Sequence, residues 1–90
     1  MDAAYYEDLA GRLYALLIML EDRLGGHQAR LFHHFIEVGE YGLALEEITG
    51  PLAQATIAIT DQERRDMLTL ARRMQMEDII PHALESCPRQ

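Results

Sequence analysis

Leucines that recur every three or four residues dominate the first quarter of the chain and constrain its fold most strongly. Between residues 2 and 24 they form one apolar stripe along a helix of 3.6 residues per turn. The stripe consists of Leu9, Leu13, Leu16, Leu17, Leu20 and Leu24, with Tyr6 on the same side. Gly25 and Gly26 follow directly and are expected to end this helix. The stripe has to be buried, so the rest of the chain must supply a core.

The middle of the chain continues the helical pattern. A helix over residues 27–38 is expected to end at Gly39 and to direct inward Leu31, Phe32, Phe35 and Val38. A helix over residues 40–49 is expected to bury Tyr41, Ala44, Leu45 and Ile48. Gly50-Pro51 is expected to interrupt it, and residues 52–57 then resume as a short helical turn.

The clearest local signal is a capping box formed by Thr60 and Glu63. It predicts a helix over residues 61–76 in which Asp61 pairs with Arg65. The face expected to be buried consists of Met67, Leu70, Ala71 and Met74. A short segment over residues 78–85 is helical if Pro81 lies in its first turn, and residues 86–90 are expected to be a frayed tail.

These segments leave no alternating pattern of the kind that predicts a strand, and the connections between them are short. Ninety residues suffice for one core. The sequence therefore predicts a single all-α domain over residues 1–85, a compact bundle of four to five antiparallel helices, followed by the tail.

The balance of charge excludes several classes of partner. Fifteen acids face eight bases, all of them arginine, and the formal net charge is −7. A chain this acidic is expected to bind neither nucleic acid nor an anionic membrane surface. The longest apolar run, residues 13–20, is too short to cross a bilayer. A single cysteine, Cys87, and the lack of a recognisable export signal indicate a cytoplasmic protein.

Residues suited to catalysis are sparse. His33 and Glu37 have the i, i+4 spacing of two metal ligands, and His34 is adjacent, but no second segment offers an obvious third ligand. Cys87 has no fixed base nearby in sequence. We therefore expect no enzymatic activity and no cofactor. A metal-dependent enzyme built on the two histidines and Glu37 is the least favoured hypothesis.

Carboxylates gather around one exposed leucine of the third predicted helix. Glu40, Leu43 and Glu47 share a face at i, i+3 and i+7, Glu46 borders it, and Glu37 precedes it. We call these five residues the acidic face. An apolar anchor inside a charged rim is typical of protein interfaces. The alternative is that these glutamates are only the solvated side of a helix.

Two segments of the chain resemble the MafI family of small bacterial immunity proteins. They are residues 38–48, VGEYGLALEEI, and residues 59–74, which begin ITDQER and end LARRM. Members of that family neutralise secreted polymorphic toxins inside the producing cell. The resemblance implies a helical immunity protein whose partner is a cognate toxin domain. Many such toxins are nucleases with basic clefts, which an acidic helix face would complement.

A second functional hypothesis needs no toxin. Tyr14 and Ile18 lie on the side of the first helix opposite its leucine stripe. They are candidates for a two-fold contact between copies of the chain. The alternative function is therefore a helical adaptor or dimerisation module.

Overall fold

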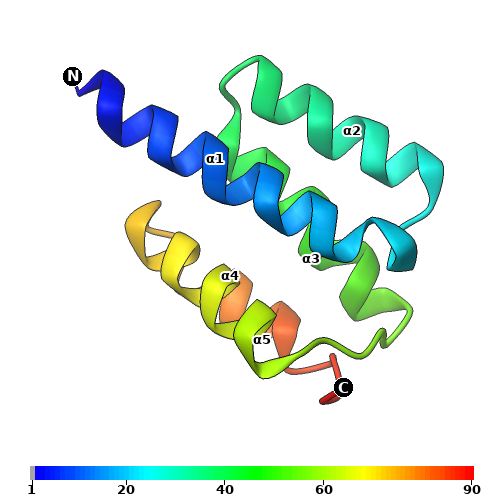
Figure 1. Cartoon of the computed structure of the whole chain (residues 1–90). Coiled ribbons are helices and arrows are strands. Elements are labelled where there is room, and N and C mark those ends of the chain that lie inside the picture. The colour runs from blue at the N-terminus through cyan, green and yellow to red at the C-terminus, as the bar shows by residue number, and fades with distance from the viewer. Residues whose placement is uncertain (1) are drawn as a thin grey trace.

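The computed structural model describes residues 2–90 and shows an all-α protein (Figure 1). Its elements are α1 (Ala3–Leu20), a 3-10 turn η1 (Glu21–Arg23), α2 (Gly26–Glu37), α3 (Tyr41–Gln54), α4 (Asp61–Arg73) and α5 (Ile80–Leu84). Helices α1 to α4 alternate in direction, as the predicted antiparallel bundle requires (Figure 1). Within residues 2–90, none of these helices is both long and apolar enough to cross a membrane.

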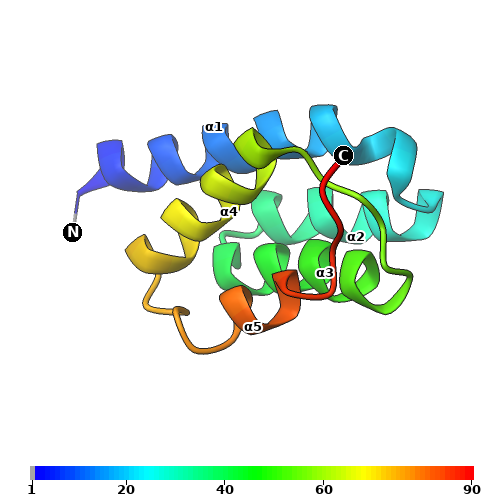
Figure 2. The ribbon, with the colours of Figure 1, turned by 90° about the horizontal axis from the view of Figure 1, so that it is seen from below.

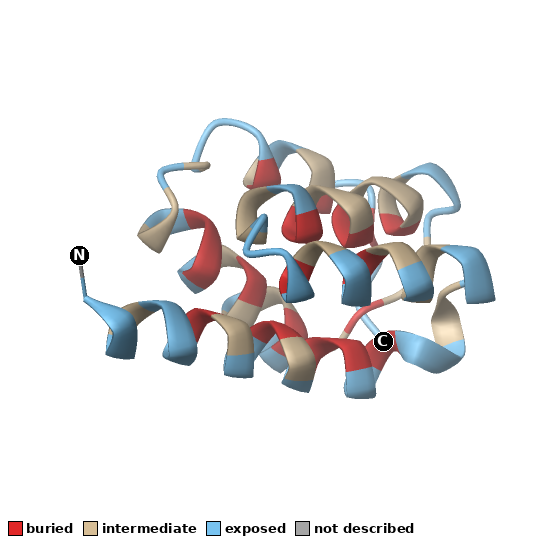
Figure 3. Cartoon of the chain, turned by 90° about the horizontal axis from the view of Figure 1, so that it is seen from above, coloured by how far each residue is buried: buried red, intermediate tan, exposed pale blue. Residues whose placement is uncertain are grey.

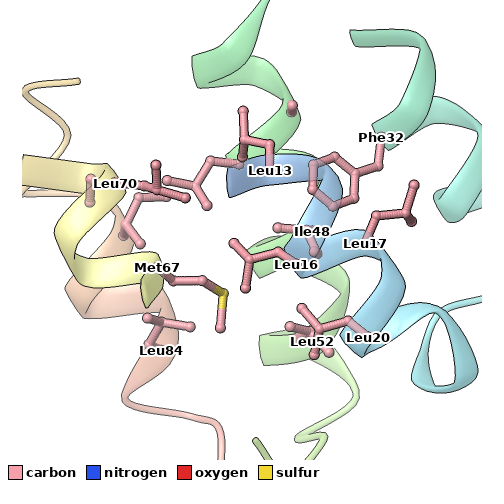
Figure 4. Packing of buried hydrophobic residues seen from close by; sticks show 14 of the residues in the cluster. Leu13, Leu16, Leu17, Leu20, Phe32, Ile48, Leu52, Met67, Leu70 and Leu84 are labelled. Atoms are coloured by element: carbon pink, nitrogen blue, oxygen red, sulfur yellow. The ribbon is translucent and has the colours of Figure 1, made fainter. Parts of the chain in front are cut away.

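One continuous core holds the helices together. Helix α3 contacts α2 on one side and α5 on the other, and α1 crosses α2, α3 and α4 (Figure 2). Buried positions face inward on every helix, while the outer sides are exposed (Figure 3). Leucines of α1 meet Phe32 of α2, Ile48 and Leu52 of α3, and Met67 and Leu70 of α4 at the centre (Figure 4).

The leucine stripe of α1 is confirmed over most of its length. Leu9, Leu13, Leu16, Leu17 and Leu20 are all buried. The helix ends earlier than predicted, because η1 tightens the last turn. Leu24 is consequently only half-buried, and Tyr6 is exposed at the open end of α1.

The buried side of α2 differs from the predicted one. Phe32 and Ile36 are its buried residues, whereas Val38 is 55% exposed. Val38 caps the end of the helix, so it no longer lies on a helical face that the core can cover. The predicted stop is correct, since Gly39 adopts the left-handed φ of +78° that favours glycine.

The predicted break at Gly50-Pro51 is wrong, because α3 continues through Pro51 to Gln54. Ile48 and Leu52 lie one turn apart on either side of the proline, and both are fully buried. Burial of two such side chains contributes about 3–6 kcal/mol. This gain equals or exceeds the roughly 3 kcal/mol that a proline costs inside a helix. Core packing therefore overrides the local signal.

The capping box of α4 is confirmed. The hydroxyl of Thr60 accepts from the backbone N–H of Glu63 at 3.0 Å, and the Glu63 carboxylate accepts from the Thr60 N–H at 2.8 Å. The predicted pairing of Asp61 is not formed. Asp61 pairs instead with Arg89, while Arg65 donates to Gln62.

A buried ion pair joins the end of α1 to the start of α4. The Arg23 guanidinium donates to both carboxylate oxygens of Glu63, at 2.8 and 2.5 Å, and to the Met19 and Ala58 carbonyls. Glu63 is 2% exposed. The bonds from Arg23 hold the pKa of Glu63 below its usual value, against the opposing effect of burial.

The predicted frayed tail is wrong, because residues 86–90 are ordered. This segment runs beside the connection between α3 and α4 (Figure 2), where Ile59 forms an isolated parallel bridge with Arg89. The Ile59 N–H donates to the Pro88 carbonyl, and the Gln90 N–H donates to the Ile59 carbonyl, both at 2.9 Å. Cys87 is buried in the core. The carbonyl of Cys87 also accepts from Arg64 at 2.6 Å, so the segment is anchored by both apolar and polar contacts.

The Glu63 carboxylate should make stability depend on acid pH. Its pKa is lowered in the folded chain from an unfolded value near 4.5. Its contribution is therefore complete above that value and is lost as the pH falls through the folded pKa. Urea unfolding across pH 2 to 7 should show this loss, and Glu63→Gln should flatten it while lowering stability at pH 7 by about 3 kcal/mol. An unchanged slope in the variant would contradict the role of the pair.

Removal of residues 86–90 should destabilise the fold. The truncation exposes Ile59 and removes the burial of Cys87 together with two backbone hydrogen bonds. We expect a loss of about 2–4 kcal/mol in urea unfolding. The matched control is Arg89→Ala, which removes only an exposed ion pair and should cost much less than the truncation. A truncated chain as stable as the parent would mean that the tail is frayed after all.

Candidate functional site

The acidic face surrounds the first half of α3. Glu37 is the last residue of α2, Glu40 caps the start of α3, and Leu43 lies on the first turn, 46% exposed. Leu43 lies opposite Leu45 and Ile48 on the helical wheel, which explains its exposure. Glu37 and Glu40 thus flank the short connection from α2 to α3, while Leu43, Glu46 and Glu47 follow along the first half of α3.

Glu46 and Glu47 are less exposed than the sequence predicts. Both are half-buried. On the helical wheel Glu46 lies on the side of Gly42, where Met76 approaches α3, and Glu47 lies on the other side of Leu43. They flank Leu43 on its two sides, so the apolar residue lies between carboxylates as predicted.

The carboxylates of the acidic face have no arginine partner, in contrast to Asp8, Asp61 and Glu63. Glu40, Glu46 and Glu47 form no ion pair with any residue from 2 to 90, and Glu37 contacts only His33, at 3.0 Å. No arginine or lysine occurs between Arg30 and Arg64. The absence of local bases leaves a concentrated negative potential around Leu43.

Two exposed carboxylates on the α1 and α4 side are paired with arginines. Asp8 contacts Arg73 at 2.6 Å and Arg12 at 2.9 Å, and these bonds lower its pKa. Asp61 has its pKa lowered by Arg89. Arg12, Arg73 and Arg89 are thus engaged within the chain.

The connection between α4 and α5 adds residues that sequence reasoning missed. Met76 lies against the first turn of α3, where a Cβ on Gly42 would be 3.4 Å from its Sδ atom. Glu77 and Asp78 follow and are exposed, and Ile79 is 53% exposed. The only signal in the sequence is the pair Ile79-Ile80, of which a short helix can bury one. Residues 77–79 belong to this surface only because Met76 packs near Gly42, a tertiary contact that spans more than 30 residues.

The residues considered for catalysis or metal binding are dispersed. The His33 ring contacts the Tyr14 ring at 5.4 Å and the Glu37 carboxylate, and the part of the chain that the structure describes contains no group of three potential metal ligands. Cys87 is buried, and burial raises the pKa of its thiol, with a smaller opposing effect of Arg64. This environment keeps the thiol protonated and inaccessible.

Comparisons with known proteins add nothing to this geometry. No family model, no curated protein and no solved structure matches the chain. A functional proposal therefore rests on the residues of this chain.

If Leu43 serves the surface and not the core, its replacement should leave stability nearly unchanged. We expect Leu43→Ser to alter the free energy of unfolding by less than about 0.5 kcal/mol. The matched control two residues away is Leu45→Ala, which empties a fully buried site and should cost about 2–5 kcal/mol. Urea unfolding of both variants measures the contrast. Equal losses would show that Leu43 is a core residue.

Proposed function

We propose that this chain is an immunity protein that neutralises a cognate secreted bacterial toxin by binding it through the acidic face. The observation that carries the proposal is Leu43, exposed on a rigid helix among carboxylates that have no arginine partner. Carboxylates that serve only solubility need no apolar residue at their centre. An anchor inside a charged rim is what a protein partner recognises.

The chemistry of the acidic face favours a basic partner. Nuclease-type toxins hold phosphates in basic clefts, and Glu40 and Glu47 would meet such a cleft with opposite charge. Opposite charge raises the rate of association, while burial of the exposed Leu43 would slow dissociation. Inhibition would then be by occlusion, in the cytoplasm of the producing cell, with no reaction catalysed by the chain itself.

The rigidity of the face also supports binding without rearrangement. Helix α3 is fixed by Ala44, Leu45 and Ile48, all fully buried. A preformed surface loses little conformational entropy when a partner binds. The acidic face therefore suits tight recognition of one partner.

A growth rescue tests the function itself. The C-terminal domain of the protein encoded immediately upstream is induced with and without this chain. We expect toxicity that disappears on co-expression, with the two proteins purifying as a complex. A toxic neighbour that this chain fails to relieve would contradict the immunity role and favour the adaptor hypothesis.

Charge reversal tests the face. Glu40→Lys with Glu47→Lys should slow association with the toxin domain by about tenfold at low salt, and the difference should shrink as salt screens it. The matched control is Glu7→Lys with Glu85→Lys, which makes the same change of charge on exposed residues outside the acidic face. Surface plasmon resonance measures both. Unchanged association in the first variant, in a pair that does bind, would move the interface elsewhere.

A further inference from the structure

The outer side of α1 carries an apolar surface that the fold leaves uncovered. Ile18 is 71% exposed, the largest value among the large apolar residues that the structure describes, and Met19 is 42% exposed. Ala15, one turn before Met19, is also exposed. Tyr14 is not part of this surface, because it is half-buried against the His33 ring. The apolar contact available to a partner is therefore centred on Ala15, Ile18 and Met19.

A groove opens beside this surface, between α1 and α4. It has a volume of about 170 Å³, with Arg12 and Ala15 on one wall and Asp66 and Thr69 on the other. Leu16 and Leu70 line it and are otherwise almost wholly buried. Met19 projects one helical turn from the Ala15 wall. Helix α1 thus lines an apolar groove and also carries Met19, an exposed apolar side chain of the kind that fills such a groove.

We propose that the occupant of this surface is a second copy of the chain, docked through an antiparallel pairing of the two α1 helices. A two-fold contact repeats each interaction, so a surface that binds itself must carry both halves of every interaction. With the helices crossing near residues 16 and 17, Met19 of each copy faces the groove of the other. Ile18 of each copy lies opposite Ala15 of the other, where the small side chain lets the helices approach closely.

Charge complementarity supports the antiparallel direction. Arg12 lies toward one end of the surface, and Glu21 and Asp22 lie about 15 Å away at the other, at 1.5 Å per helical residue. Antiparallel pairing brings each Arg12 beside the two carboxylates of the other copy, and it does so twice. The bond from Arg12 to Asp8 does not prevent this, because Asp8 is also held by Arg73. A parallel pairing would set like charges side by side.

This surface is separate from the acidic face, so the proposal does not rest on the immunity function. In Figure 1 α1 lies in front and α3 behind it, with the core between them. A dimer through α1 would leave Glu40, Leu43 and Glu47 of both copies open to a partner.

Sedimentation velocity over a hundredfold range of concentration tests the dimer. We expect reversible dimerisation of the full chain and at least about tenfold weaker self-association in Ile18→Glu. The thermal melting of the variant should match the parent, because Ile18 is exposed. The matched control, Leu43→Glu, places the same charge on the acidic face and should dimerise like the parent. A parent that stays monomeric throughout would overturn the proposal, as would a dimer lost in Leu43→Glu and kept in Ile18→Glu.

A charge swap tests the direction of pairing. Arg12→Glu alone should weaken the dimer, and adding Glu21→Arg and Asp22→Arg should restore it. Failure to restore it, with the triple variant folded by circular dichroism, would exclude the antiparallel contact. Toxin binding lost in Ile18→Glu, with no dimer in the parent, would assign the surface to the toxin instead.

Discussion

The Arg23 guanidinium fixes how the parts of this fold meet. It donates to Met19 at the end of α1, to Ala58 in the connection before α4, to Glu63 in the first turn of α4 and, at 3.4 Å, to the side chain of Gln90. Removing two charges from water is costly, and a buried pair often stabilises a protein less than apolar residues would. The pair also favours this docking of α1 on α4, because an arrangement that moves Arg23 away leaves the buried Glu63 without its charged partner. No buried side-chain nitrogen or oxygen in the described residues lacks a partner, as this requires.

The same carboxylate shows where sequence reasoning succeeds and where it stops. The Thr60 to Glu63 spacing predicts a capping box because both halves of the contact lie within one turn. The second bond, to Arg23, spans 40 residues and leaves no local trace. The leucines of α1 are likewise predictable from the helical period alone. In α2, Ile36 is buried in place of the predicted Val38, because the end of that helix depends on how the chain turns into α3. Local patterns thus predict the helices, and the contacts between them decide their ends.

Two differences from the predicted fold have one cause. Pro51 lies within α3 because Ile48 and Leu52 are both fully buried, and residues 86–90 are ordered because Cys87 and Ile59 are buried together. Proline and a polar terminal segment are reliable signs of a break or a frayed end only where nothing nearby offers burial. In a chain of 90 residues the core reaches nearly every segment, so apolar contacts outweigh local propensity more often than in the periphery of a larger domain.

Charge distribution explains why the candidate interface is located on α3. Asp8, Asp61 and Glu63 are each bound by an arginine, and these arginines link segments that are far apart in the sequence. Glu40 and Glu47 have no such partner. The part of the acidic face that lies on α3, including Leu43, was predictable from helical spacing alone. Ile79 and its acidic neighbours were not, because only the contact of Met76 with the first turn of α3 brings them there. Unpaired charge on α3 together with exposed Leu43 and Ile79 is the reason that the proposed partner is a basic protein that covers both segments.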